Sequence, residues 1–436
     1  MSAPASSPVE RVALAHADLR GRLPGGPAWQ ARRDAALERL LRAGLPDRRS
    51  ENWKYLDWPE VMAREFAPAA GPAAAPAAPG TGFELGGACR IVTVDGRYSP
   101  GLSDRALPDG VAVEDLGAAL ERDPALAGRL RVPGDDADDR FALLAEAFTD
   151  AGVLIRIAAG AKVEAPLQLV HLGSAASSHA RIVIEAGDAS RASVVEQFLG
   201  GAEGGLANLA VEIAVGAGAR LEHVRLHEQQ AAAVHVETLA VVQERDSRYR
   251  QQVFVLGGRV VRSGLRLRLA GAGAETEVEG LFMVDGQRQA DLYTLIEHLA
   301  PHTRTVENFR GVASDRGRGA FNGRIVVHEG AAKADSRQSN RNLILTPLAE
   351  INSRPQLEIL TDDVKCSHGS TVGSLDPQQL FYLLSRGLDP ATARGLLTFA
   401  FCEDVVARIP WPGLRRHVEE LVVGRLPDRD IIREFV

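Results

Sequence analysis

Residues 180–192 read ARIVIEAGDASRA, a short run of alternating apolar and polar side chains that ends in a corner of small residues. Alternation with a period of two is typical of a β-strand with one buried face. The same texture extends from Gly152 to Leu375, where similar runs read VLIRIA, LAVEIAV, VETLAVV and GRIVVHEG. This part of the chain is therefore predicted to consist of many short strands joined by tight turns.

Five of the corners resemble one another and recur at regular distances. They begin at residues 160, 187, 218, 273 and 330 and read GAKVEA, GDASRA, GARLEH, GAETEV and GAAKAD. Their separations are 27, 31, 55 and 57 residues, and the last two are close to double the first two. A weak period of this size indicates a solenoid. Because the strands follow one another too closely for crossover helices, a parallel β-helix is favoured over a doubly wound sheet. A β-sandwich is the alternative, although a sandwich of more than about 200 residues would be unusually large.

The segments on either side of this region differ in composition. Residues 1–66 are predicted to be helical, residues 67–82 to form a flexible linker of Ala, Pro and Gly, and residues 83–151 to be a mixed α/β lead-in. The parallel β-helix is assigned to residues 152–375 and a C-terminal helical domain to residues 376–436. Near the start, RRSENWKYLDWPEVM crowds three aromatic residues together, which we interpret as a packing anchor: Trp53, Tyr55 and Trp58.

The C-terminal segment carries clear helix signals. Asp376-Pro377 and Asp389-Pro390 each place an N-cap residue before a proline at the first helical position, and HVEELVVGRL adds a third helix. Aromatic residues, including Phe381 and Tyr382, widen the apolar stripes of these helices beyond a simple core face. The helices are therefore predicted either to cap the solenoid, to dock a partner, or to do both.

Composition excludes several classes of protein. The net charge is −7, which argues against nucleic-acid binding, and no N-terminal stretch has the pattern of a signal peptide. The longest uncharged segment, FAPAAGPAAAPAAPGTGF, carries four prolines and is not a membrane helix. Three cysteines lie far apart, so no disulfide framework is expected, and a reducing cytoplasm is the predicted compartment.

One cysteine lies two places before a histidine, in TDDVKCSHGSTVG, residues 361–373. On a strand, Cys366 and His368 would point to the same side and could share a ligand. The alternative is that both are ordinary packing residues. An iron–sulfur cluster held by one chain needs about four cysteine ligands, and this chain has no CxxC motif. If the pair binds iron or a cluster, another chain must therefore supply the remaining ligands.

Other catalytic patterns are absent from the sequence. None of the four lysines ends a P-loop, neither His-Glu pair continues to HExxH, and no GxSxG elbow is found. Two further histidine pairs are interpreted first as packing residues. His223 and His227 would share a face in either a helix or a strand, whereas Pro301 interrupts any helix that would align His298 with His302.

Several longer stretches carry a resemblance to a known family. HLAPHTRTVENFRG, FNGRIVVHEGAAKADSRQSNRNLIL and RPQLEILTDDVKCSHGSTVGSLDPQQLFYLLSRG occur in this order, with RRSENWKYLDW near the start. Together they closely resemble the SufB/SufD family, the scaffold family of the Suf iron–sulfur cluster assembly machine. ENWKY and KCSHG are similar to the SufD branch, and the further cysteines usual in SufB are missing.

The resemblance implies a mainly β fold, with a right-handed parallel β-helix flanked by N-terminal and C-terminal α-helical regions. It implies a non-enzymatic scaffold subunit of a SufBCD complex, in which the SufC ATPase docks on the C-terminal helices. The expected docking residues are Phe381, Tyr382, Leu384, Arg386 and Leu388. SufB is expected to meet the end of the β-helix near Cys366 and His368, where a nascent iron–sulfur cluster or iron is held transiently and completed by SufB.

The resemblance also associates such complexes with reduced flavin (FADH2), for which it assigns no residues here. No cofactor is expected to bind the isolated chain tightly. Exposed strand edges at the end of a β-helix favour pairing, so a homodimer of the isolated chain stays open beside the monomer.

Two other functions compete with this interpretation. A secreted-type β-helix acting on polysaccharides would need paired carboxylates above a groove, yet Asp362 and Asp363 are adjacent and would face opposite sides of a strand. A purely structural adaptor would have no metal site. Iron and sulfide content of the assembled complex separates these alternatives.

Overall fold

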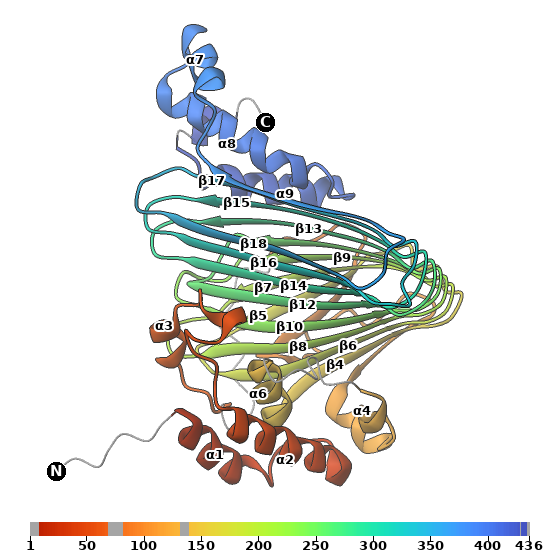
Figure 1. The fold of residues 1–436 in the computed structure, drawn as a ribbon. Coiled ribbons are helices and arrows are strands. Elements are labelled where there is room, and N and C mark those ends of the chain that lie inside the picture. Colours follow the sequence, from red (N-terminus) through yellow and green to blue (C-terminus); the bar gives the residue numbers. More distant parts are fainter. Residues whose placement is uncertain (1–7, 69–81, 131–138, 428, 434–436) are drawn as a thin grey trace, which may run out of the picture.

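The computed structural model describes residues 8–68, 82–130, 139–427 and 429–433. Most of the segment predicted to be a linker, residues 67–82, lies outside the described residues. The centre of the molecule is a stack of long strands, with the N-terminal helices at one end of the stack and the C-terminal helices near the other (Figure 1).

The strands form two sheets, and consecutive strands of the central region alternate between them. The 10-stranded sheet has the order β19-β17-β15-β13-β11-β9-β7-β5-β1-β2, and the 9-stranded sheet has the order β18-β16-β14-β12-β10-β8-β6-β4-β3. All pairings are parallel except β1 with β2 and β3 with β4. The predicted parallel β-helix is confirmed, and the sandwich alternative is excluded because its strands would pair antiparallel.

The bounds of the strands are as follows. The 10-stranded sheet contains β1 (Cys89–Val94), β2 (Arg97–Tyr98), β5 (Leu167–Gly173), β7 (Arg191–Gly200), β9 (Arg220–His227), β11 (Arg248–Val255), β13 (Glu275–Val284), β15 (Arg304–Ala313), β17 (Asp335–Ile344) and β19 (Lys365–Gly373). The 9-stranded sheet contains β3 (Val111–Asp115), β4 (Ala151–Ile157), β6 (Ser178–Ala186), β8 (Leu206–Val215), β10 (Val234–Gln243), β12 (Val260–Leu269), β14 (Gln289–His298), β16 (Arg318–Val327) and β18 (Glu350–Ile359). Strands β1 and β3, which come from the segment expected to be a lead-in, extend these sheets.

The corners explain the period of the sequence. Each has one residue in the left-handed region, with φ between 55° and 73°, at Gly160, Ala189, Gly218, Asp246, Gly273, His302 and Lys333. Successive members of this series lie 27 to 31 residues apart. Asp246 and His302 divide the two double-length gaps, so each gap hides one turn whose left-handed residue is not glycine. Glycine is favoured at such a position because a Cβ atom makes positive φ costly.

Side chains alternate between the inside of the solenoid and its outer faces. Along β9, Leu221 lies in the interior core while Val224 and Leu226 pack outward. Parallel pairing without a shift of register stacks equivalent residues of successive turns, so the interior is built from columns of side chains.

The N-terminal helices cover the outer face of the 9-stranded sheet. Val234, Val236 and Val260 on that face pack in one cluster with aromatic residues of the helical region, including Trp53 and Phe141. The centroids of the Trp53 and Phe141 rings lie 5.2 Å apart. The interpretation of the tryptophans as packing anchors is confirmed, since Trp53 and Trp58 are both buried. The helices are α1 (Pro8–Leu19), α2 (Gly26–Ala43), the 3₁₀ helix η1 (Glu51–Trp53), α3 (Trp58–Met62), α4 (Leu116–Arg122), α5 (Leu126–Arg129) and α6 (Arg140–Phe148).

The C-terminal helices are α7 (Pro377–Ser385), α8 (Pro390–Val406), α9 (Pro412–Val423) and α10 (Arg429–Ile432). Both predicted N-caps are confirmed, because Asp376 accepts a hydrogen bond from the Gln378 N–H and Asp389 accepts from the Ala391 N–H. Cys402 and Val405 of α8 pack on the outer face of the 10-stranded sheet, so this helix lies along the side of the solenoid and not across its end. Helix α7 instead projects beyond the last turn (Figure 1).

Within the described parts of the chain, no helix combines the length and the apolar character needed to cross a membrane.

Candidate functional site

The solenoid ends in two strands that are each bonded on one side. In the described part of the chain, β18 pairs with β16 alone and β19 pairs with β17 alone. Three apolar side chains at this end are exposed, with relative exposures of 42% for Ile359, 47% for Leu360 and 44% for Val372. An unpaired strand edge beside exposed apolar side chains is a surface suited to strand addition by another chain.

Cys366 and His368 lie on this last strand. Their register partners on β17 are Ser336 and Gln338, and both partners are buried inside the solenoid. The two side chains therefore stand on the same side of β19, over interior columns. Cys366 is half-buried against the core, whereas His368 is exposed. Burial raises the pKa of the Cys366 thiol, and a hydrogen bond from the Ser336 backbone opposes this shift.

The two donors do not form a complete metal site by themselves. Among the described residues, the group of His, Cys, Asp or Glu side chains close enough to hold a metal ion does not include Cys366 or His368. A thiolate and an imidazole are competent iron ligands, but two ligands leave a cluster weakly held. The arrangement offers part of a coordination sphere at an open surface.

The interior beneath this end is polar, a feature that sequence reasoning missed. Gln338, Asn340 and Asn342 alternate along β17 and are all buried. The Asn342 amide donates to Asn340 Oδ1 over 2.6 Å, and the Ser353 hydroxyl of β18 donates to the same oxygen over 2.6 Å. Polar alternation normally predicts a solvent-facing side of a strand. One signal could have found these residues. Residues 335–344 show no apolar alternation, and Gln338, Asn340 and Asn342 lie on the opposite side of this strand from Leu343.

Glu307 lies one layer deeper. It is the register partner of Gln338 on β15, and the Gln338 amide donates to its Oε2 over 2.6 Å. Complete burial raises the pKa of Glu307 from 4.5 to about 7, against the opposing effect of the bond from Gln338. His368, Gln338 and Glu307 thus occupy successive layers of one column.

The ENWKY stretch lies beside the last strands. Glu51 forms an ion pair with Arg354 of β18. Asn322 of β16 links the two regions further, because it donates to Asn52 Oδ1 over 3.4 Å and accepts from the Gln356 amide over 2.9 Å. Two segments that lie 303 residues apart at Glu51 and Arg354 therefore support the same end of the solenoid.

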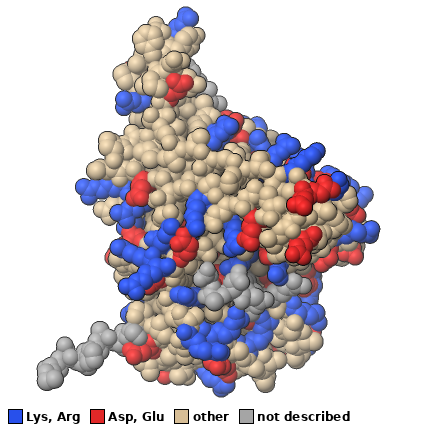
Figure 2. Space-filling view, viewed as in Figure 1, with Lys and Arg blue, Asp and Glu red and all other residues tan. Residues whose placement is uncertain are grey.

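Helix α7 is the other exposed feature near this end. None of its described residues is buried, and Phe381 and Tyr382 have relative exposures of 72% and 57%. The guanidinium of Arg386 lies 5.2 Å from the centre of the Tyr382 ring. Leu384 is exposed and Leu388 is half-buried. The projecting tip carries few charged side chains (Figure 2). Exposed apolar patches of this kind mark interaction surfaces.

The other histidine pairs separate into two cases. His298 is buried and bonded to Thr303 and Thr305, whereas His302 occupies a corner with positive φ, so these two do not form a pair of ligands. His223 and His227 both point into the solenoid, where they belong to a buried polar network. Asp362 and Asp363 lie in the loop between β18 and β19, where Asp363 forms an ion pair with Lys333 over 2.7 Å.

Comparison with known proteins agrees with this architecture. Residues 170–401 match the family model described as the SUF system FeS cluster assembly SufBD core domain, and residues 26–169 match the SufBD protein N-terminal region. The iron–sulfur cluster assembly protein SufD of Escherichia coli is 31% identical over 90% of this chain and 92% of its own length. The chloroplastic protein ABCI7 of Arabidopsis thaliana is 27% identical over 90% of this chain and 85% of its own. SufD of Bacillus subtilis is 26% identical over 74% and 75%, respectively. The two family models together match residues 26–401, and with the 31% identity to a relative over 90% of the chain they show that this chain belongs to the SufBD family of iron–sulfur cluster assembly proteins.

Proposed function

We propose that this chain is the SufD-type subunit of a SufBCD-like assembly complex and contributes half of a transient iron or cluster site. The observation that carries the proposal is the pair Cys366 and His368 on an unpaired edge strand, over a polar interior. A SufB-type chain would add its own strands to β18 and β19 and supply the missing ligands. Iron or the nascent cluster is the cargo of this site and not a resident cofactor.

The exposed face of α7 is proposed as the docking site for the SufC ATPase. Phe381, Tyr382 and Leu384 offer the apolar area, and Arg386 packs over Tyr382. The chain itself acts as a scaffold, because its sequence has no P-loop and ATP hydrolysis would belong to the docked subunit. Reduced flavin is part of the proposed complex without an assigned site on this chain.

The first test compares the metal content of assembled complexes. The chain is co-expressed with a SufB and a SufC and purified without oxygen, and iron and acid-labile sulfide are measured per complex. His368→Ala is expected to lower iron content several-fold and Cys366→Ala to lower it less, because the exposed imidazole is free to reach a shared ion whereas the thiol is half-buried. Ser370→Ala and Ser367→Ala, on the same strand, are the matched controls.

Thermal unfolding of each variant complex is recorded beside the metal analysis. Unchanged iron loading in His368→Ala would reject the half-site and leave a purely structural adaptor. A large loss of stability in this variant would instead identify His368 as a packing residue, since truncating a buried side chain costs a few kcal/mol.

A further inference from the structure

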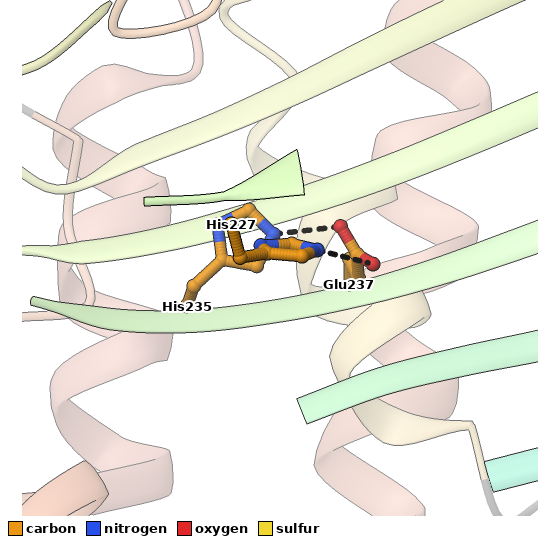
Figure 3. A group of neighbouring side chains, drawn as sticks. All are labelled: His227, His235 and Glu237. Carbon is orange, nitrogen blue, oxygen red and sulfur yellow. Dashed lines mark hydrogen bonds and ion pairs between the residues drawn. The ribbon is translucent and has the colours of Figure 1, made fainter. Parts of the chain in front are cut away.

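A second group of potential ligands lies deep inside the solenoid, several turns from β19. His227 is the last residue of β9, and His235 and Glu237 follow on β10 after the turn at residues 228–233. His235 and Glu237 are two residues apart and therefore point to the same side, which is the interior. All three side chains are buried, and they converge from the two sheets on one point (Figure 3).

The geometry of the three side chains is close to that of a metal site. Their donor atoms all lie within 4.8 Å of one another. His235 Nε2 lies 2.7 Å from Glu237 Oε2, and His227 Nε2 lies 3.4 Å from Glu237 Oε1. The two imidazole rings are nearly perpendicular, at 72°, with centroids 5.0 Å apart. Ligand atoms placed about 2.0–2.2 Å from a shared ion lie at similar separations from one another.

His227 carries the second observation. Its side chain is fully buried, and its Nε2 atom faces Glu237 Oε1 at 3.4 Å without forming a regular hydrogen bond. Gln229 lies against the other ring nitrogen, with 3.3 Å between Gln229 Nε2 and His227 Nδ1, while Gln229 Oε1 has no partner of its own. The oxygen and nitrogen of an amide are assigned from such contacts. With the amide of Gln229 rotated, Oε1 accepts from the Nδ1–H of His227 and leaves Nε2 as a free lone pair, the arrangement that metal-bound histidines adopt.

The charges around the group favour a cation. Glu237 and Glu196 are both fully buried and share one guanidinium, that of Arg225, over 3.0 Å and 2.9 Å. Further polar neighbours include His171 and His223 beside Glu196, Tyr249 beside His223, and Ser263, the register partner of Glu237. With neutral imidazoles this network has one more negative than positive charge. An unbalanced buried charge is costly, so this network attracts a cation, and a divalent ion next to Glu237 would change its sum from one negative to one positive charge.

A cavity borders one member of the group, His235. It has a volume of about 70 Å³ and is lined by His235, Phe198, His171, Gln229 and Asp95, among others. Phe198 stacks between His171 and His227, with centroid separations of 4.7 Å and 4.5 Å. The cavity gives His235 a side that is not filled by protein, where an ion could enter.

We propose that His227, His235 and Glu237 form an internal binding site for one divalent first-row transition metal ion, separate from the site at Cys366 and His368. Two imidazole nitrogens and one carboxylate are a donor set that suits Zn²⁺, Fe²⁺ and Co²⁺. Gln229 is a positioning residue that orients His227. The site does not depend on the proposed function, because it needs no partner chain.

The test uses Co²⁺ as an optical probe and the full chain treated with a chelator. Cys366→Ser/His368→Asn is the background protein, so that ions at the open end do not contribute. This protein is expected to bind one Co²⁺ with visible absorption bands. Adding His235→Asn or His227→Asn is expected to weaken binding at least tenfold. Adding His298→Asn, a buried interior histidine of β14 that is bonded to Thr303 and Thr305 and lies outside this network, is the matched control and is expected to keep the affinity of the background.

A second measurement uses Zn²⁺ and the melting temperature. Its main arm is the background protein, so it does not require the histidine variants to fold. An ion that binds only the folded chain raises its melting temperature. Zn²⁺ is therefore expected to raise the melting temperature of the background protein and of the His298→Asn variant, but not of the His235→Asn variant. A background protein without a Zn²⁺-dependent shift, or His235→Asn binding Co²⁺ as tightly as His298→Asn, would overturn the proposal.

Discussion

At the scale of single residues, Glu307 links the interior to the pH of the surroundings. Its folded-state pKa is raised by burial from 4.5 to about 7, so the folded chain keeps a proton that the unfolded chain has released over this range. Unfolding then releases a proton, and stability falls as the pH rises from about 4.5 to about 7. Above about pH 7 the loss of unfolding free energy has reached its full value.

The Glu307→Gln variant is expected to lose this dependence. The difference in unfolding free energy between variant and parent should grow with pH and reach about 3 kcal/mol in favour of the variant near pH 8, since each pKa unit corresponds to about 1.4 kcal/mol. Urea unfolding at pH 4.5 and pH 8 measures it. Glu329→Gln, at an exposed turn, is the control, and equal pH profiles for Glu307→Gln and the parent would contradict the assignment.

The residues of the candidate site were predictable to different degrees. Cys366 and His368 stand out in the sequence because cysteine is rare here and the spacing of two fits a strand. Gln338 and Asn340 do not, because polar side chains are normally assigned to the solvent side and only the stacking of turns buries them. His227, His235 and Glu237 come from two strands in different sheets, and sequence spacing alone does not reveal that they converge.

At the scale of elements, α7 differs from the other C-terminal helices. Its caps and apolar stripe were readable from the sequence, but the stripe does not meet the solenoid. Helix α8 does, through Cys402 and Val405, so removing residues 376–436 would also uncover Phe254 and Leu281 on the outer face. Substitutions within α7 therefore test partner docking more cleanly than truncation does.

Phe381→Ala/Tyr382→Ala is expected to weaken co-purification of the SufC ATPase strongly, because large exposed apolar side chains dominate interfaces of this kind. Its melting temperature should match that of the parent, since neither side chain is buried. Ile431→Ala, which removes an exposed apolar side chain from α10, is the control. Undiminished capture of SufC by the double variant would place the docking surface elsewhere.

The corners show what a sequence period can and cannot reveal. Gly160, Gly218 and Gly273 are the left-handed residues of three of the five corners on which the prediction rested, and Ala189 and Lys333 are those of the other two. The turns at Asp246 and His302 were not recognised in the sequence, because a residue other than glycine adopts the same left-handed backbone conformation there. Their presence could be inferred only from the doubled spacing.

At the scale of the whole molecule, the chain covers both outer faces and leaves the last turn open. The positions of the N-terminal and C-terminal helical regions on the solenoid were not predictable from the sequence. The contact of Glu51 with Arg354, for example, joins segments that only the folded solenoid brings together. Exposed Ile359, Leu360 and Val372 line the open end.

Val372→Lys is expected to abolish pairing at this end, whether with SufB or with a second copy of the chain, because a charge on an edge strand opposes strand addition. Light scattering of the isolated chain and co-purification with SufB measure the two cases. Leu14→Lys, at an exposed position of α1 in the N-terminal region, should change neither. If both variants pair as the parent does, the open end is not the interface.

The two ends of the solenoid also determine how many other chains it can pair with. At the first end, β2 and β3 run antiparallel to their neighbours, and β2 has only two residues. At the last end, β18 and β19 finish in register with the turns before them. A rod with two equal ends could add copies indefinitely and grow into a filament. A rod with one pairing end has a valence of one, so when two such ends meet both are consumed and the product is a closed pair.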